Sequence, residues 1–195
     1  IVRAGYGISF NNGSYASIAR QLVAQPPFAT TNTTLGTLDA PLSLTNALAT
    51  ASSSTTNNYG VDKDYRLGAL HTWNVDVTRT LARGWQAGGG YTGTQGRHLD
   101  IVRAPNRGPD GLRIPDVQPF LWQTSEGEST LHALTVRVRR QQTRGIAGAA
   151  SYTLAKSIDN ASSIGGGGQT VAQNDQDLDA ERGLSSFDRR HQFES

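Results

Sequence analysis

Three aspartates at alternate positions are the residues whose spacing points most directly to metal chemistry. Asp175, Asp177 and Asp179 form a D-x-D-x-D run, and carboxylates at the first, third and fifth positions begin a calcium loop of the EF-hand type. The run then departs from that pattern, because Ala180 stands where glycine is required and Ser186 stands where a bidentate glutamate is required. The sequence therefore disfavours an EF-hand, and leaves a weak calcium site or a solvated acidic loop as the alternatives.

The four histidines, His71, His98, His132 and His191, are the other residues that could bind a metal. Two ligands on one face of a strand must be two positions apart, and no two of these histidines are. His71 and His132 are predicted to lie at equivalent levels of two strands, in polar packing at an interface. The chain has no Cys and no G-x-S-x-G, H-E-x-x-H or P-loop motif. We therefore predict no catalytic residue, no cofactor and no enzymatic activity.

Basic side chains gather at Arg137, Arg139, Arg140 and Arg144. Guanidinium groups bind phosphate well, but the favoured interpretation is that they pair with carboxylates such as Asp76. The chain carries 18 basic and 16 acidic residues. Because its formal net charge is only +2, the charge does not indicate a nucleic acid partner.

Period-two alternation of apolar and polar residues is the main structural signal. In residues 1–10 every even position is apolar and the odd positions from 3 to 9 are Arg, Gly or Ser, a separation that a strand gives and a helix does not. A short helix is predicted to follow Asn12-Gly13-Ser14 and to end before Pro26-Pro27. The predicted strands are about 1–10, 67–81, 85–97, 129–141, 146–157 and 188–195. The predicted extracellular loops are about 11–66, 98–128 and 158–187.

Long strands, long loops on one side and short turns on the other are typical of a membrane barrel. We predict an all-β fold, an antiparallel meander forming part of a large transmembrane β-barrel. The side chains predicted to face the lumen are Asn74, Asp76, Arg137 and Arg139. Those predicted to face lipid or to form an aromatic girdle are Tyr6, Phe10, Trp73, Trp85, Tyr91, Val136 and Tyr152. The alternative is a soluble or cell-surface β-rich binding or adhesion module, in which the apolar face meets a second sheet.

Short stretches distributed in order along the chain resemble a known family. They are Val2–Gly7, Gln25–Phe28, Thr72–Asn74, Gly90–Gly93 with Gly96–Leu99, Ala133–Arg140, Ser151–Asp159 and Arg182–His191. The sequence is similar to the barrel region of TonB-dependent outer-membrane receptors of the Oar-like group.

The resemblance implies a barrel of about 22 strands, a plug inside it, and energy drawn through a TonB box. The implied partners are outer-membrane lipid, the rest of the barrel and its plug, the TonB system and an unknown ligand. The implied location is the outer membrane of a Gram-negative bacterium. Because the chain starts in one alternating stretch and stops in another, and contains neither a plug nor a TonB box, we expect it to be a section of a longer protein.

Two adjacent positions test the assignment of the faces. We expect Val136→Arg to destabilise the inserted protein by about 2–4 kcal/mol, because its side chain would enter the middle of the lipid layer. Thr135→Arg should be much milder, since position 135 faces the other way. The unfolding free energy of the full-length protein in lipid vesicles measures both. Equal losses would contradict the assignment.

Overall fold

One large sheet organises the chain. The computed structural model describes residues 1–12, 14–29, 32–33, 38, 41, 43, 45, 52–53, 58–108, 110–115, 119–143, 145–161 and 171–195, so parts of all three predicted loops lie outside the described residues. The long strands are β1 (Val2–Phe10), β5 (Ala69–Thr80), β6 (Trp85–Arg103), β9 (Phe120–Thr143) and β10 (Ile146–Asp159). The shorter elements are β2 (Asn32–Thr33), β3 (Ser52–Ser53), β4 (Asn58–Val61), β7 (Arg107–Gly108), β8 (Gly111–Leu112), β11 (Gly183–Leu184) and β12 (His191–Glu194).

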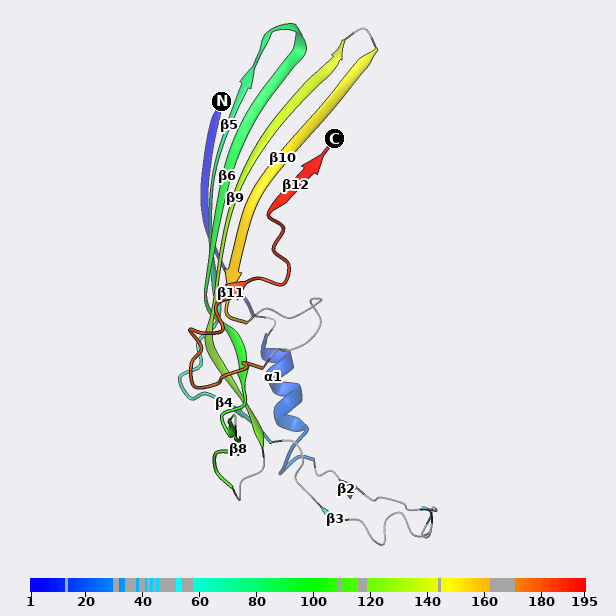
Figure 1. Cartoon of the computed structure of the whole chain (residues 1–195), viewed down its shortest axis with the longest axis vertical. Helices are drawn as coiled ribbons and strands as arrows, with labels where there is room; N and C mark the ends of the chain where they lie inside the picture. Colours follow the sequence, from blue (N-terminus) through cyan, green and yellow to red (C-terminus); the bar gives the residue numbers. More distant parts are fainter. Residues whose placement is uncertain are drawn as a thin grey trace.

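Neighbours in the sheet follow the order of the chain. The long strands pair as β1-β5-β6-β9-β10, all antiparallel, and both β11 and β12 pair with β10. β4 adds to β9 in parallel. Figure 1 shows these strands side by side and bending together along their length. The meander that the alternation predicted is therefore confirmed, and it is the topology that tight antiparallel connections produce.

The two ends of the sheet differ. At the short-turn end, β5 passes to β6 through the 3₁₀ turn η1 (Ala82–Gly84), and β9 passes to β10 through Gly145 (Figure 1). Left-handed backbone makes these turns tight, with φ of 61° at Arg83, 77° at Gly84 and 82° at Gly145. At the opposite, long-loop end, Phe10 pairs with Ala69, and the long connections begin there.

Two strands run further toward the long-loop end than predicted. β6 reaches Arg103, where the sequence predicted a strand end at 97, and β9 begins at Phe120 rather than 129. The pairing slips between Gly96 and Leu99 and again between Leu99 and Ile101. Such bulges break the alternation that marks a strand in sequence, so much of the predicted loop 98–128 is strand. Conversely, the predicted strand 188–195 is shorter, since β12 covers only His191–Glu194.

The predicted short helix is confirmed as α1 (Ser14–Val23), which ends before the Pro26-Pro27 pair. It lies alongside the long-loop part of the sheet, next to β4 (Figure 1). Within the part of the chain that the structure describes, no helix is long and apolar enough to cross a membrane.

A small core lies at the long-loop end. The buried apolar side chains among the described residues are Tyr59, Ile101, Val102 and Ala104, beside buried Gln123. The Tyr59 hydroxyl donates to Gln123 Oε1 at 3.1 Å, and burial, aided by the charge of Asp100, raises the pKa of Tyr59. In the rest of the long strands many large apolar side chains are exposed, among them Tyr6, Leu134 and Val136. The buried apolar core of the described residues is therefore confined to this end.

One glycine at the bulge offers a test of this architecture. A Cβ on Gly127 would lie 2.7 Å from the backbone oxygen of Leu99, too close for either strand to accept without moving. We expect Gly127→Ala to cost about 1–3 kcal/mol by overpacking, seen as faster amide exchange in β6 beyond Leu99. Gly7→Ala is the matched control, because a Cβ there meets nothing within 4 Å. Unchanged exchange in the Gly127 variant would show that the bulge is not held as described.

Candidate functional site

The register gives the sheet two distinct faces. The polar face carries Asn74, Asp76, Arg137 and Arg139, the four residues predicted to face a lumen. Pairing aligns Asp76 with Gly90 on β6, and Gly90 in turn with Thr135 on β9. The polar face therefore brings residues of β5 and β9 together across a strand whose side chains are small.

An ion pair crosses that gap. Arg137 Nη2 binds Asp76 Oδ2, and Thr78 Oγ1 donates to the other carboxylate oxygen at 3.1 Å. A Cβ on Gly90 would lie 2.9 Å from Asp76 Oδ2 and 3.3 Å from Arg137 Nη2. The absence of a side chain at Gly90 therefore lets the two charged side chains meet above β6. The predicted partnership of Arg137 with Asp76 is thus confirmed. Because 53% of the Arg137 side chain is exposed, the ion pair contributes little to the stability of the fold. Its charged groups form part of the solvent-accessible polar face.

The apolar face carries the predicted lipid-facing and girdle residues. Leu134, Val136 and Val138 follow one another on β9 with 49%, 50% and 38% of their surface exposed. Tyr6, Phe10, Trp85, Tyr91 and Tyr152 are exposed as well, and Trp73 is half-buried because its ring lies over Gly93. Phe10 lies near the long-loop end and Trp85 at the short-turn end. An apolar surface of this extent marks contact with a partner or a membrane.

A third feature joins neighbouring strands on the apolar face. The hydroxyls of Tyr6, Tyr91 and Tyr152 each lie 2.7 Å from Nδ1 of a histidine on the next strand, His71, His132 and His191 respectively. His71 and His132 were predicted at equivalent levels, and the pairing aligns His132 through Gly93 with Trp73, two positions from His71 along β5. The tyrosine partners were not predicted. The diagonal spacing of the two residue types across each strand pair was the signal that could have found them.

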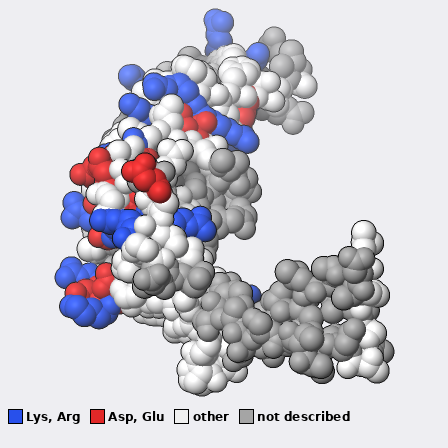
Figure 2. All heavy atoms as spheres, turned by 60° about the horizontal axis from the view of Figure 1, so that its bottom comes forward, with Lys and Arg blue, Asp and Glu red and all other residues white. Residues whose placement is uncertain are grey.

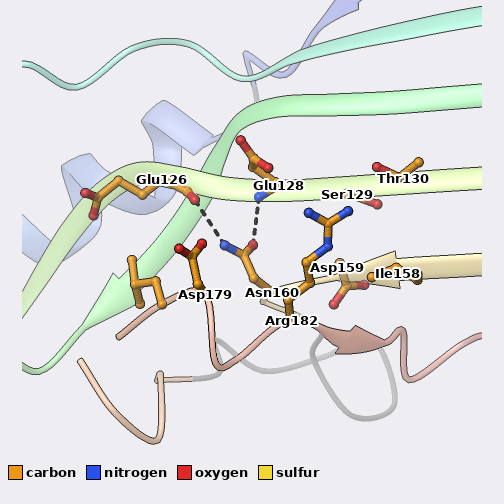
Figure 3. A pocket seen from close by; sticks show the side chains of 10 residues that line it. Glu126, Glu128, Ser129, Thr130, Ile158, Asp159, Asn160, Asp179 and Arg182 are labelled. Carbon is orange, nitrogen blue, oxygen red and sulfur yellow. Dashed lines mark hydrogen bonds between the residues drawn. The ribbon is translucent and has the colours of Figure 1, made fainter. Parts of the chain in front are cut away.

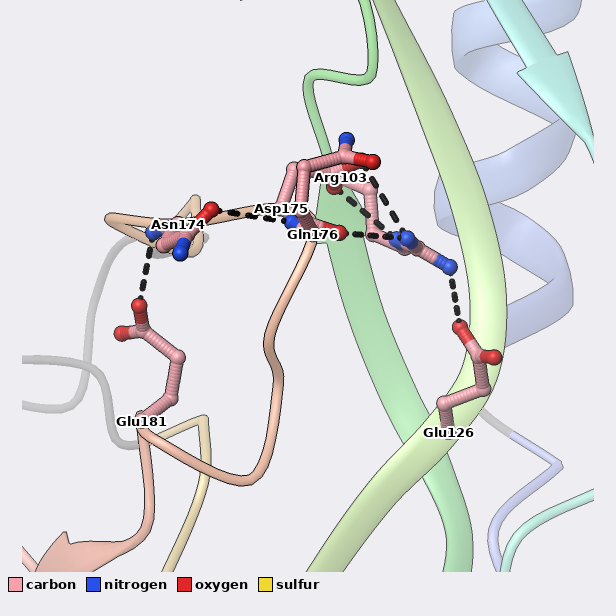
Figure 4. Close-up of polar contacts among 6 residues, drawn as sticks. All are labelled: Arg103, Glu126, Asn174, Asp175, Gln176 and Glu181. Carbon is pink, nitrogen blue, oxygen red and sulfur yellow. Dashed lines mark hydrogen bonds and ion pairs between the residues drawn. The ribbon is translucent and has the colours of Figure 1, made fainter. Parts of the chain in front are cut away.

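An arginine holds the long-loop end together (Figure 4). Arg103 Nε donates to Asp175 Oδ1 at 2.9 Å, Nη2 donates to the Asp175 backbone oxygen at 2.6 Å, and Nη1 donates to Glu126 Oε2 at 2.6 Å. Burial alone would lower the pKa of Arg103, but the hydrogen bond and charge of Asp175, with the charge of Glu126, outweigh it and raise that pKa. The charged guanidinium therefore ties the segment around Asp175 to both β6 and β9.

A polar cavity of about 240 Å³ lies beside this network (Figure 3). Asn160 closes one side, accepting from the Glu128 backbone N–H at 2.7 Å and donating to the Glu126 backbone oxygen at 3.2 Å. Asp159, Asp179 and Arg182 add charge of both signs to the lining. In Figure 2, where this end comes forward, side chains of both charges gather along one side. The arrangement suits a small polar or charged group.

The comparison with protein families decides the identity of this architecture. A model of the family described as the outer membrane beta barrel domain matches residues 1–195, the whole chain. The chain belongs to this family. No curated protein and no solved structure matches it. Family membership confirms the predicted barrel fold and the predicted outer-membrane location, while the assignment of individual residues to lumen and lipid stays a prediction.

The acidic run of this outer-membrane barrel chain does not assemble as metal ligands. The side chain of Asp175, 3% exposed, is bound to Arg103, and Asp177 Oδ1 accepts from the Ala180 backbone N–H at 3.2 Å. Across the described residues, no three His, Asp or Glu side chains converge in a way that could hold a metal ion. The weak calcium possibility at Asp175, Asp177 and Asp179 stays a prediction, and the observed partner of the Asp175 carboxylate is Arg103.

Removing the arginine tests what the network does. We expect Arg103→Gln to lower the local opening free energy of the segment around Asp175 by about 2 kcal/mol, less than a fully buried pair would lose, because 23% of the Arg103 side chain is exposed. Amide exchange of residues 171–182 in the full-length protein measures the loss. The control Lys63→Gln breaks an exposed pair with Asp64 and should cost no more than about 1 kcal/mol. A loss no greater than this control would show that Arg103 does not hold the segment.

Proposed function

We propose that the chain is a wall section of a TonB-dependent transporter, which captures a ligand at its long-loop end and passes it inward. The observation that carries the proposal is the built polar surface at that end, where β6 and β9 extend beyond the wall and Arg103 fixes the segment around Asp175. A recognition surface needs such rigidity, because ordering loops on binding costs affinity. The ordered resemblance to receptors of the Oar-like group also supports it.

The polar face supplies the second part of the mechanism. Across the wall it presents Asn74, the Asp76–Arg137 pair and Arg139, with glycine between them at Gly90. In the proposal this face lines a water-filled lumen occupied by a plug, and these hydrogen-bonding groups contact the plug or the moving ligand. The plug and the energy-coupling segment belong to the longer protein, and an inner-membrane partner of the TonB type moves the plug.

The proposal assigns the chain no enzymatic step, no cofactor and no nucleic acid partner. Outer-membrane barrel membership disfavours the soluble alternative, while a cell-surface adhesion role is an alternative that the experiment below separates from transport. The cavity lined by Glu126, Asn160 and Arg182 is the proposed contact point for a polar part of the ligand, since charge-assisted hydrogen bonds recognise small polar groups strongly.

Energy dependence tests the proposal in cells that express the full-length protein. We expect one of a panel of ferric chelates, cobalamin and maltodextrins to accumulate only when the gene is present, and a protonophore to abolish the accumulation. Arg182→Gln should weaken the apparent affinity by about tenfold, the loss of one charge-assisted hydrogen bond. Asp64→Asn, an exposed position outside the cavity, should leave it unchanged.

Three outcomes would overturn this function. Uptake that persists with the protonophore, together with open conductance in planar bilayers, would identify a passive pore. Cell aggregation without uptake of any panel member would favour adhesion. Recovery of the full-length protein in the soluble fraction without detergent would contradict the membrane-barrel architecture on which the proposed function depends.

A further inference from the structure

The three tyrosine–histidine pairs recur with regular geometry, and we call them together the Tyr–His belt. The pairs are Tyr6 with His71, Tyr91 with His132, and Tyr152 with His191. The hydroxyl-to-Nδ1 distance is 2.7 Å in each, and the ring centroids lie 6.1–6.2 Å apart. Each pair bridges a different couple of neighbouring strands, β1 with β5, β6 with β9 and β10 with β12. One interaction is therefore repeated across the whole width of the wall.

The belt crosses the strands at a constant slope. Followed through the register to β5, Tyr6 aligns with Trp73, Tyr91 with Val75, and Tyr152 with Val77. Each step across two strands thus moves two residues along them. Two residues correspond to about 6.7 Å along a strand, and two strand spacings to about 9.6 Å across the sheet. The belt is therefore inclined by about 35° to the direction perpendicular to the strands. Barrel strands tilt from the barrel axis by about 35–45°, and a tilt of this size in the sense that compensates the slope places the whole belt at one depth in a membrane.

A sequence repeat on β5 and β9 marks the other boundary of the apolar band, on the short-turn side. His71–Arg79 and His132–Arg140 both read His-x-(Trp or Leu)-x-Val-x-Val-x-Arg. The eight residue steps from the His to the Arg span about 27 Å of strand, or about 22 Å of depth at that tilt. This approaches the apolar band of about 25 Å that surrounds outer-membrane barrels. At the short-turn boundary the Arg140 guanidinium lies 5.6 Å from the centre of the Trp85 ring.

The chemistry of the belt favours an anion. Either atom of each tyrosine–histidine contact can be the donor. In the tautomer whose Nδ1 accepts from the hydroxyl, the ring hydrogen is on Nε2, and among the described residues no protein group is recorded as its acceptor in His71, His132 or His191. Lys156 lies directly opposite His132 and is exposed. In the three register rows that hold these histidines, the apolar face contains no Asp or Glu.

We propose that the Tyr–His belt and Lys156 form a contact site for the phosphate groups of the lipid headgroups around the long-loop end of the barrel. The tyrosine rings remain in the apolar layer while their hydroxyls reach its edge, an arrangement that amphipathic aromatic side chains favour. The imidazole N–H groups and the ammonium then point to the level of the headgroups. The site depends on the barrel standing in a membrane and not on transport.

Lipid binding to the full-length protein tests the site. The probe is dimyristoylphosphatidylglycerol added to the protein in a neutral detergent, with a phosphate-free digalactosyl lipid of the same chain length as reference. We expect the phospholipid to raise the thermal midpoint more than the galactolipid does. The combined variant His71→Phe, His132→Phe, His191→Phe and Lys156→Gln keeps the apolar rings and should lose that difference. His98→Asn, at the bulge beyond the belt, should retain it.

Three results of the binding experiment would overturn the proposal. The first is an undiminished difference between the two lipids in the combined variant. The second is equal stabilisation of the unaltered protein by both lipids. The third is competition by millimolar inorganic phosphate, which would assign the site to a soluble anion. If the combined variant does not fold, Lys156→Gln alone should reduce the difference, and an unchanged difference counts against the site.

Depth is measured independently with spin labels. In a full-length background without other cysteines, His71→Cys, His132→Cys and His191→Cys should report the same depth from oxygen and nickel-chelate accessibility, close to the headgroups. Val136→Cys should report the apolar interior. Different depths for the three belt positions, or a depth equal to that of position 136, would contradict the belt.

Discussion

Backbone pairing is the constraint on which the wall depends. Lipid offers no hydrogen bonds, so every N–H and C=O within it must find a partner in the protein. The hydrogen-bond ladder from β1 through β5, β6, β9 and β10 meets this requirement between strands. The side chains are therefore not needed to satisfy backbone groups. The wall therefore needs no packed core, which explains why the apolar side chains of β9 remain half exposed while the chain still forms a regular sheet.

Glycines on β6 leave space for side chains of the neighbouring strands to meet. On the polar face Gly90 leaves space for the ion pair between Asp76 and Arg137, and on the apolar face the Trp73 ring lies over Gly93. Both glycines are on β6, the strand between two strands with larger side chains. A strand of small residues lets its neighbours reach across it, so contacts skip one strand and link β5 with β9. The glycine content that weakens an ordinary strand here creates room for interactions.

How much the sequence predicts depends on how strongly each face is constrained. The wall strands were predicted because lipid on one side and water on the other impose strict alternation. The extension of β6 was missed because the bulges around Leu99 shift the phase. The link from Arg103 to Asp175 joins positions 72 residues apart, and no local pattern reveals such a contact. For the same reason the sequence did not predict the arginine partner of Asp175.

The bulges in β6 mark a change of side-chain pattern along a single strand. On β6, Gln95 shares the register row of His71, and the pairing with β9 slips just after the next residue, Gly96. Beyond the slip, Ile101 and Val102 are consecutive and both buried, which requires cover on both faces of the strand. Before it, the apolar side chains lie on one face and are exposed. A strand that passes from lipid into water must exchange one pattern for the other, and a bulge makes that exchange within a few residues because it changes which side chains face each side. Thus the irregularity that concealed the extension of β6 in the sequence is also the place where the alternating pattern of the wall ends.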